Sequence, residues 1–217
     1  MSSDPILIGV LALQGAFLEH IHQLNQLGVK TIEVRNIDEL NSTDGLIIPG
    51  GESTSMSLIA ERWNLLEPLK QYVQSNRVVF GTCAGMILLS DIVDNQKQTG
   101  QYNLGGLQCT IHRNFYPNGQ LGSFSSQYES QVLAERYGGS TQVQAVFIRA
   151  PGITSVGDRC EVLCSVPVDD VHNIGAVDNP IAIRQNNILA TTFHPVCIHI
   201  AVIYNKQYPD MILLVFK

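Results

Sequence analysis

The sequence predicts an α/β fold in which a mostly parallel sheet is flanked by helices and extended by antiparallel hairpins. In the first half of the chain, short apolar runs alternate with segments whose apolar residues recur at helical spacing, and buried strands that alternate with helices form parallel sheets. In the second half, strand-like segments follow one another with turns between them, which is typical of hairpins. Because the chain has 217 residues, we expect residues 1–217 to form a single domain.

The first half contains alternating strand and helix signals. Apolar residues recur at helical spacing from Phe17 to Leu24, with Gly28 as a stop signal, and again from Met56 to Trp63. An apolar helix is expected at residues 86–93. Four buried strands are expected, at residues 6–13, 31–34, 45–48 and 77–80.

The second half has few helical stripes. Its polar, glycine-containing segments at residues 95–103 and 114–142 are expected to be loops. The apolar segments between and after them are expected to be strands, at residues 105–113, 145–149, 161–166, 173–177, 181–184 and 188–193.

The composition excludes several classes of protein. Hydrophobic residues make up 45% of the chain and charged residues 15%, which is typical of a globular protein. The net charge is −6 and no basic stripe is present, which argues against a nucleic acid partner. The apolar run at residues 6–13 is too short to span a membrane and follows no basic region, so we expect a cytoplasmic protein without a membrane partner. The 5 cysteines form no CxxC pair, and an odd number is a poor disulfide framework.

The strongest local signal is Gly81-Thr82-Cys83-Ala84-Gly85, between a buried strand and an apolar helix. A nucleophile flanked by small residues at such a junction lies on a sharp turn that exposes its side chain at the carboxyl edge of the sheet. The start of the following helix favours the thiolate form of Cys83, and the N–H of Ala84 can hold an oxyanion. The alternative is a buried cysteine in a glycine-rich turn.

A second glycine-containing turn, Pro49-Gly50-Gly51-Glu52-Ser53, follows the third strand. Two glycines let the backbone approach a ligand closely and present N–H groups to an oxyanion or a carboxylate. An ordinary strand-to-helix turn, with Ser53 or Thr54 as the helix cap, explains the same pattern equally well.

Two further residues stand at the ends of expected strands. His194 ends the last strand of the sheet and is a candidate base for a cysteine nucleophile, although a lone histidine is more often structural. Arg149 could grip a substrate carboxylate or form a surface ion pair. His20 and His22 occupy adjacent helical positions that cannot share a metal ion, and both are expected at the surface. No metal or cofactor is expected.

Five sequence blocks occur in order along the chain, at residues 9–16, 49–56, 81–87, 147–151 and 193–195. Together they resemble the PdxT/SNO family, the glutaminase subunits of pyridoxal 5′-phosphate synthase, and the resemblance spans residues 6–195. The resemblance implies a class I glutamine amidotransferase fold, which is a flavodoxin-like three-layer sandwich. It also implies hydrolysis of L-glutamine to glutamate and ammonia.

The resemblance implies a role for each matching position. Cys83 would be the nucleophile and His194 the base of a Cys-His-Glu triad, with the N–H groups of Gly51 and Ala84 holding the oxyanion. The residues implied to bind glutamine are Gly51, Glu52, Ser53, Arg113, Ile148 and Arg149. The implied partner is the synthase subunit, a barrel that receives the ammonia through a tunnel.

The chain departs from the family pattern in three places. The His-Pro-Glu sequence of the family is His194-Pro195-Val196 here, so the third member of the triad is missing. The Arg-Asn-x-Phe-Gly-Arg-Gln loop corresponds to residues 113–120, which lack the second arginine. A charged amphipathic helix is expected after Pro195, but residues 196–217 are largely apolar, which is an aggregation hazard.

These departures leave alternatives open. Residues 196–217 could be translated from a retained intron or a frameshifted exon, because Val196-Cys197 can be encoded by GTATGT, a common fungal intron start. An uninterrupted mature transcript that encodes these residues would exclude this hypothesis. The chain could also be a catalytically impaired subunit that binds and regulates the synthase, or an unrelated cysteine hydrolase with a similar turn.

Overall fold

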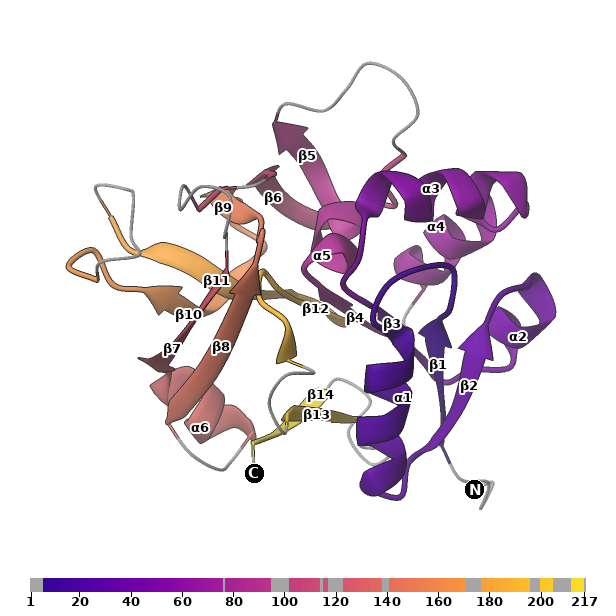
Figure 1. Cartoon of the computed structure of the whole chain (residues 1–217), viewed down its shortest axis with the longest axis horizontal. Coiled ribbons are helices and arrows are strands. Elements are labelled where there is room, and N and C mark those ends of the chain that lie inside the picture. Colours follow the sequence, from indigo (N-terminus) through magenta and orange to yellow (C-terminus); the bar gives the residue numbers. More distant parts are fainter. Residues whose placement is uncertain are drawn as a thin grey trace.

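A computed structural model describes residues 6–75, 77–94, 102–113, 115–116, 123–137, 141–170, 177–195, 200–204 and 212–216. Within these residues, a central seven-stranded sheet has helices on both of its faces (Figure 1). Three smaller sheets lie around it.

The central sheet has the strand order β10-β11-β12-β4-β3-β1-β2. Strands β2, β1, β3, β4 and β12 pair in parallel, whereas β11 and β10 extend the sheet in antiparallel pairing. This arrangement confirms the predicted fold class. The strand bounds are β1 (Leu7–Leu11), β2 (Lys30–Val34), β3 (Gly45–Ile48), β4 (Val78–Thr82), β10 (Glu161–Val166), β11 (Asn179–Gln185) and β12 (Ile188–Thr191).

The helices cover the sheet because successive residues of a buried strand point to opposite faces. The buried hydrophobic residues form two clusters. Val79 belongs to one cluster, together with Met56 of α3 and Met86 of α5. The next residue, Phe80, belongs to the second cluster, together with Leu24 of α1. The result is a three-layer sandwich. The helix bounds are α1 (Phe17–Gln26), α2 (Ile37–Asn41), α3 (Ser53–Arg62), α4 (Leu66–Gln74), α5 (Ala84–Leu89) and α6 (Gln131–Tyr137).

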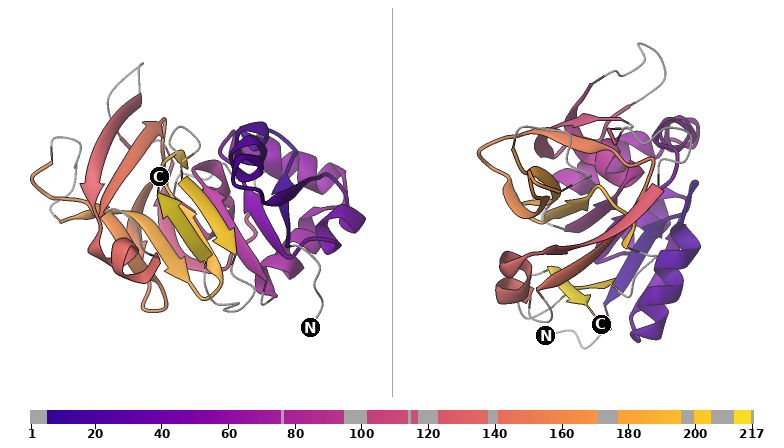
Figure 2. Two further views of the ribbon diagram at one scale, coloured as in Figure 1. Left: turned by 90° about the horizontal axis from the view of Figure 1, so that it is seen from below. Right: turned by 60° about the vertical axis from the view of Figure 1, so that its left-hand side comes forward.

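The smaller sheets are built largely from the second half of the chain. One contains β5 (Ser90–Asp94), β6 (Leu107–His112) and β9 (Gly152–Val156), and another pairs β7 (Ser123–Glu129) with β8 (Gln142–Ile148). The third pairs β13 (Ile200–Tyr204) with β14 (Ile212–Phe216) in antiparallel register. Its strands lie near α1 and α6, beside the central sheet (Figure 2).

The predicted helix at residues 86–93 is too long. Helix α5 ends at Leu89, and the next residue, Ser90, begins β5 and pairs with Leu107 of β6. The Leu88 carbonyl accepts a hydrogen bond of 2.7 Å from the N–H of Leu104. A continuous apolar run has no periodicity of its own, so pairing with a distant strand decides where the helix stops.

The predicted loop at residues 114–142 is also wrong in part, because it contains β7 and α6. Phe124 of β7 stacks on Phe147 of β8 with ring centroids 4.4 Å apart, which holds the hairpin together. Helices α2 and α4 were not predicted at all. The strand predicted at residues 173–177 falls mostly outside the described residues, and the one predicted at 181–184 begins earlier, at Asn179.

The described part of the chain contains no helix that is both long enough and apolar enough to cross a membrane.

Candidate active site

Cys83 lies at the junction of β4 and α5 with a backbone conformation of φ 48° and ψ −102°. A positive φ is uncommon for a residue with a side chain, and such strain is concentrated at functional sites. The strained backbone is held by a 2.8 Å hydrogen bond from the Cys83 N–H to the Thr191 carbonyl. A Cβ atom at Gly85 would collide with the carbonyl oxygen of Ile48, so only glycine fits there. The sharp turn predicted from the sequence is therefore present.

His194 follows β12, the strand that pairs in parallel with β4. Its N–H donates a 2.8 Å hydrogen bond to the Val146 carbonyl of β8, which fixes the backbone at this point. Because neighbouring parallel strands end at the same edge of a sheet, His194 and Cys83 reach the same side of the molecule. A Cβ atom at Gly50 would lie 2.5 Å from His194 Cε1 and 3.5 Å from Cys83 Cβ, so both side chains border the same small space.

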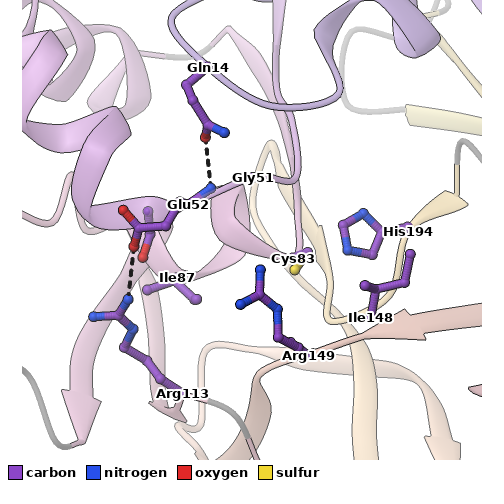
Figure 3. A pocket seen from close by; sticks show the side chains of 10 residues that line it. Gln14, Gly51, Glu52, Cys83, Ile87, Arg113, Ile148, Arg149 and His194 are labelled. Atoms are coloured by element: carbon purple, nitrogen blue, oxygen red, sulfur yellow. Dashed lines mark hydrogen bonds and ion pairs between the residues drawn. The ribbon is translucent and has the colours of Figure 1, made fainter. Parts of the chain in front are cut away.

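A pocket of about 370 Å³ opens at this edge (Figure 3). It brings together most of the residues singled out from the sequence, and it adds Gln14 and Ile87, which were not among them. Ala84 is not part of the lining, and its side chain is buried. The lining residues are Gln14, Gly51, Glu52, Ser53, Cys83, Ile87, Arg113, Ile148, Arg149 and His194.

Glu52 organises one wall of the pocket. Its carboxylate caps α3 by accepting hydrogen bonds from the N–H groups of Thr54 at 3.1 Å and Ser55 at 2.7 Å. The N-cap residue of α3 is therefore Glu52, and the expectation that Ser53 or Thr54 caps this helix is wrong. Arg113 donates from Nη2 to Glu52 Oε1 at 3.2 Å. Burial raises the pKa of Glu52, but the hydrogen bonds from Ser55 and Thr54 outweigh it and lower the pKa to about 2.

Gln14 ties this wall to the segment after β1. Its side-chain oxygen accepts a 2.7 Å hydrogen bond from the N–H of Glu52 (Figure 3). A Cβ atom at Gly51 would lie 2.5 Å from the same oxygen, so the two segments are in close contact. The sequence signal for Gln14 was its place directly after a buried strand.

Burial disfavours the charged forms of both the Cys83 thiol and the His194 imidazole, contrary to the thiolate expected at Cys83 from the start of the helix. Burial raises the pKa of Cys83 to about 12, although the Ala84 N–H and the charge of Arg149 oppose this shift. Burial also lowers the pKa of His194, against a hydrogen bond with the backbone of Ile148. Desolvation disfavours whichever form carries charge, so it moves the two pKa values in opposite directions.

Arg149 and Ile148 form the opposite rim. Arg149 has a φ of 46°, a second strained backbone position beside the pocket. Its guanidinium points toward the Cys83 thiol, in keeping with its effect on the pKa of Cys83 (Figure 3). Ile148 is 45% exposed.

The expectation that His20 lies at the surface is wrong. Its side chain is 4% exposed and faces the sheet, whereas His22 is exposed as predicted. Among the described residues, no cluster of histidine, cysteine, aspartate and glutamate side chains could hold a metal ion. Val196 and most of the segment from 114 to 122 lie outside the described residues.

Comparison with known proteins identifies the family. A sequence model of the SNO glutamine amidotransferase family matches residues 10–203. The chain is 43% identical over 202 residues to a protein of Arabidopsis thaliana named probable pyridoxal 5′-phosphate synthase subunit PDX2, covering 87% of this chain and 79% of that protein. It is 42% identical over 188 residues to the pyridoxal 5′-phosphate synthase subunit PdxT of a Nocardioides species, covering 87% of each.

Solved structures give the same result for the fold. A glutamine amidotransferase crystal structure superimposes with a TM-score of 0.74 at 34% identity, covering 88% of this chain and 92% of that one. PurLQS from Thermotoga maritima, at 14% identity and a TM-score of 0.56, shares the fold over 88% of both chains. Because the family model matches residues 10–203, the chain belongs to the SNO glutamine amidotransferase family.

Proposed function

We propose that the chain is the glutaminase subunit of a pyridoxal 5′-phosphate synthase. It hydrolyses L-glutamine to L-glutamate and ammonia, and a partner synthase subunit receives the ammonia. The family supports the glutamine amidotransferase chemistry, and the relatives named above are subunits of pyridoxal 5′-phosphate synthase. The observation that carries the proposal is that Cys83, on a strained turn, and His194 line the same pocket.

In the proposed reaction, His194 takes the thiol proton of Cys83 while the sulfur attacks the carboxamide carbon of glutamine. The N–H groups of Ala84 and Gly51 hold the oxyanion that forms. When the intermediate collapses, the C–N bond breaks and ammonia leaves with the proton from His194. Water, deprotonated by His194, then attacks the thioester, and glutamate leaves as Cys83 regains its proton.

The neutral state of both groups fits this order of steps. A thiol and a neutral imidazole are the reactants that general base catalysis needs, because the imidazole keeps a free lone pair to accept the proton. The positive charge of Arg149 favours the thiolate as it forms on Cys83.

The pocket suits a small amino acid, since about 370 Å³ is within the range of small-molecule sites. We place the α-carboxylate of glutamine against the Arg149 guanidinium, which provides two parallel hydrogen-bond donors. The remaining contacts are assigned to the backbone and side chains of Gly51, Glu52, Ser53, Arg113 and Ile148.

A second candidate function rests on Val196. The triad of the family has glutamate at this position, and a carboxylate behind the base normally fixes the histidine tautomer. The chain would then be a catalytically impaired subunit that binds the synthase and regulates it.

Glutamate and ammonia release, measured with and without the synthase subunit, separates the two functions. Turnover in the presence of the synthase subunit supports the glutaminase. If calorimetry detects glutamine binding but no turnover is measured, the result would support the regulatory subunit instead.

A further inference from the structure

His20 lies directly behind the turn that carries Cys83. It projects from α1 toward β4, where its ring meets the edge of Phe80 with centroids 6.4 Å apart and planes at 89°. Its side chain is 4% exposed. None of the pocket lining comes from α1, so His20 has no place in the proposed chemistry.

The polar contact of His20 is with the residue that precedes the nucleophile. Its Nε2 lies 3.4 Å from the Thr82 hydroxyl, and Thr82 is the last residue of β4 and 1% exposed. This distance is at the long end of the hydrogen-bond range. The contact joins α1 to the turn at its most strained point, because the next residue is Cys83 with its positive φ.

The histidine is neutral in this position. Burial is the main cause that lowers the pKa of His20 to about 3, and a proton on His194 would lower it further. A neutral imidazole has one N–H and one lone pair, so it can either donate to or accept from the Thr82 hydroxyl.

Packing alone does not account for an imidazole here. One turn later on the same buried face of α1, the equivalent space is filled by Leu24. Burying a polar ring costs free energy unless a hydrogen bond compensates for it, and the contact with Thr82 is the compensation that the structure offers.

We propose that His20 is a positioning residue for glutamine hydrolysis: it holds the Thr82 hydroxyl and thereby fixes the turn that presents Cys83 to His194. This inference rests on the proposed function, in which these two residues react with glutamine. His20 itself touches no substrate, so its effect should fall on the chemical step and leave the binding of glutamine unchanged.

The test compares five variants in the full chain with the synthase subunit present: four single substitutions and the double variant that combines His20→Leu with Thr82→Val. His20→Leu removes the hydrogen bond and keeps the bulk, whereas His20→Gln keeps a polar group that can bond to Thr82. Thr82→Val removes the hydroxyl with almost no change of shape, so it tests the same contact if His20→Leu fails to fold. His22→Leu is the matched control, because His22 is exposed on the same helix.

We expect His20→Leu and Thr82→Val each to lower kcat by about two- to tenfold, the range that the loss of one hydrogen bond gives, with KM within twofold of the parent. The double variant should lose no more than either single one, His20→Gln should recover most of the rate, and His22→Leu should match the parent. Unchanged kcat in both single variants, or losses that multiply in the double variant, would overturn the proposal.

A second readout distinguishes failure of the proposed function from failure of the positioning role of His20. If the parent hydrolyses no glutamine with the synthase subunit, the rate at which iodoacetamide alkylates Cys83, followed by peptide mass, still reports the geometry of the turn. That rate should fall in His20→Leu and Thr82→Val and recover in His20→Gln. Equal alkylation rates in the parent and all three variants would contradict the positioning role.

Discussion

Gly50 lies so close to His194 that a Cβ atom at position 50 would stand 2.5 Å from Cε1 and 2.6 Å from Nδ1 of the imidazole. Real Cβ atoms do not approach other atoms so closely, so any side chain at this position must displace the ring. The glycine is therefore a determinant of where the proposed base can sit.

Gly50→Ala should lower kcat for glutamine by about 100-fold, since a shift of about 1 Å in a reacting group has that effect. The measurement is glutamate release with the synthase subunit present. Gly28→Ala is the control: nothing lies within 4 Å of its Cβ position, and its φ of 76° makes alanine strained. It should lower the melting temperature while leaving kcat unchanged. Equal kcat in Gly50→Ala and the parent would mean that His194 is not the base.

Arg149→Ala should raise KM for glutamine by about 10- to 100-fold and change kcat less, because a charged hydrogen bond to the α-carboxylate acts in the ground state and the transition state alike. Arg159→Ala is the matched control, since Arg159 is exposed and donates to Gln108 Oε1, outside the pocket. A normal KM in Arg149→Ala would leave this arginine as a surface group without a role in substrate binding.

Stability should depend on pH through His20. Its pKa is about 3 in the folded chain, against 6.5 as the ordinary value, so the unfolded chain binds the extra proton first. The contribution of the neutral ring to the free energy of unfolding is fully present above pH 6.5. It is lost as the pH falls toward 3, at up to about 1.4 kcal/mol per pH unit. His194, whose pKa is also lowered, acts in the same direction.

Urea unfolding between pH 5.5 and 6.5 measures this slope, because Glu52, whose pKa is lowered from 4.5 to about 2, changes the stability mainly at lower pH. His20→Leu should flatten the dependence of the unfolding free energy on pH. A slope equal to that of the parent would show that His20 is protonated as easily in the folded chain as in the unfolded one.

Val196→Glu should raise glutaminase turnover if His194 lacks an orienting carboxylate. Position 196 is two residues after His194, where the family pattern has the glutamate of the triad. The gain could reach roughly 10⁴-fold, the loss seen when the carboxylate of a serine protease is disabled. Val196→Gln is the control for size. A parent that is already fast, with no gain from glutamate, would show that the third carboxylate is dispensable here.

The parts of the fold that could be predicted are those with strong local signals. Strand β3 was expected at residues 45–48 and runs from Gly45 to Ile48, because an apolar run that ends in Pro-Gly-Gly has clear limits. The turn at Cys83 was predictable for a similar reason: glycines on both sides of a small-residue motif leave few alternatives for the backbone.

The rest depended on contacts between distant residues. Nothing near Leu89 marks the end of α5, which is set by the pairing of β5 with β6. Helix α2 could have been found, because Asn36 and Glu39 form a capping box that is readable in the sequence. The burial of His20 could not be read from its own helix, since its partners Phe80 and Thr82 lie about sixty residues further along the chain.

In the proposed function, this chain hydrolyses glutamine through Cys83. The most direct test is glutamate release by the full chain with the synthase subunit, compared between the parent and Cys83→Ser, with Cys164→Ser, a buried cysteine outside the pocket, as the control. We expect turnover in the parent and in Cys164→Ser, and loss of at least nine-tenths of it in Cys83→Ser with the fold retained. Equal turnover in the parent and Cys83→Ser, or none in the parent with the synthase subunit present, would contradict the account.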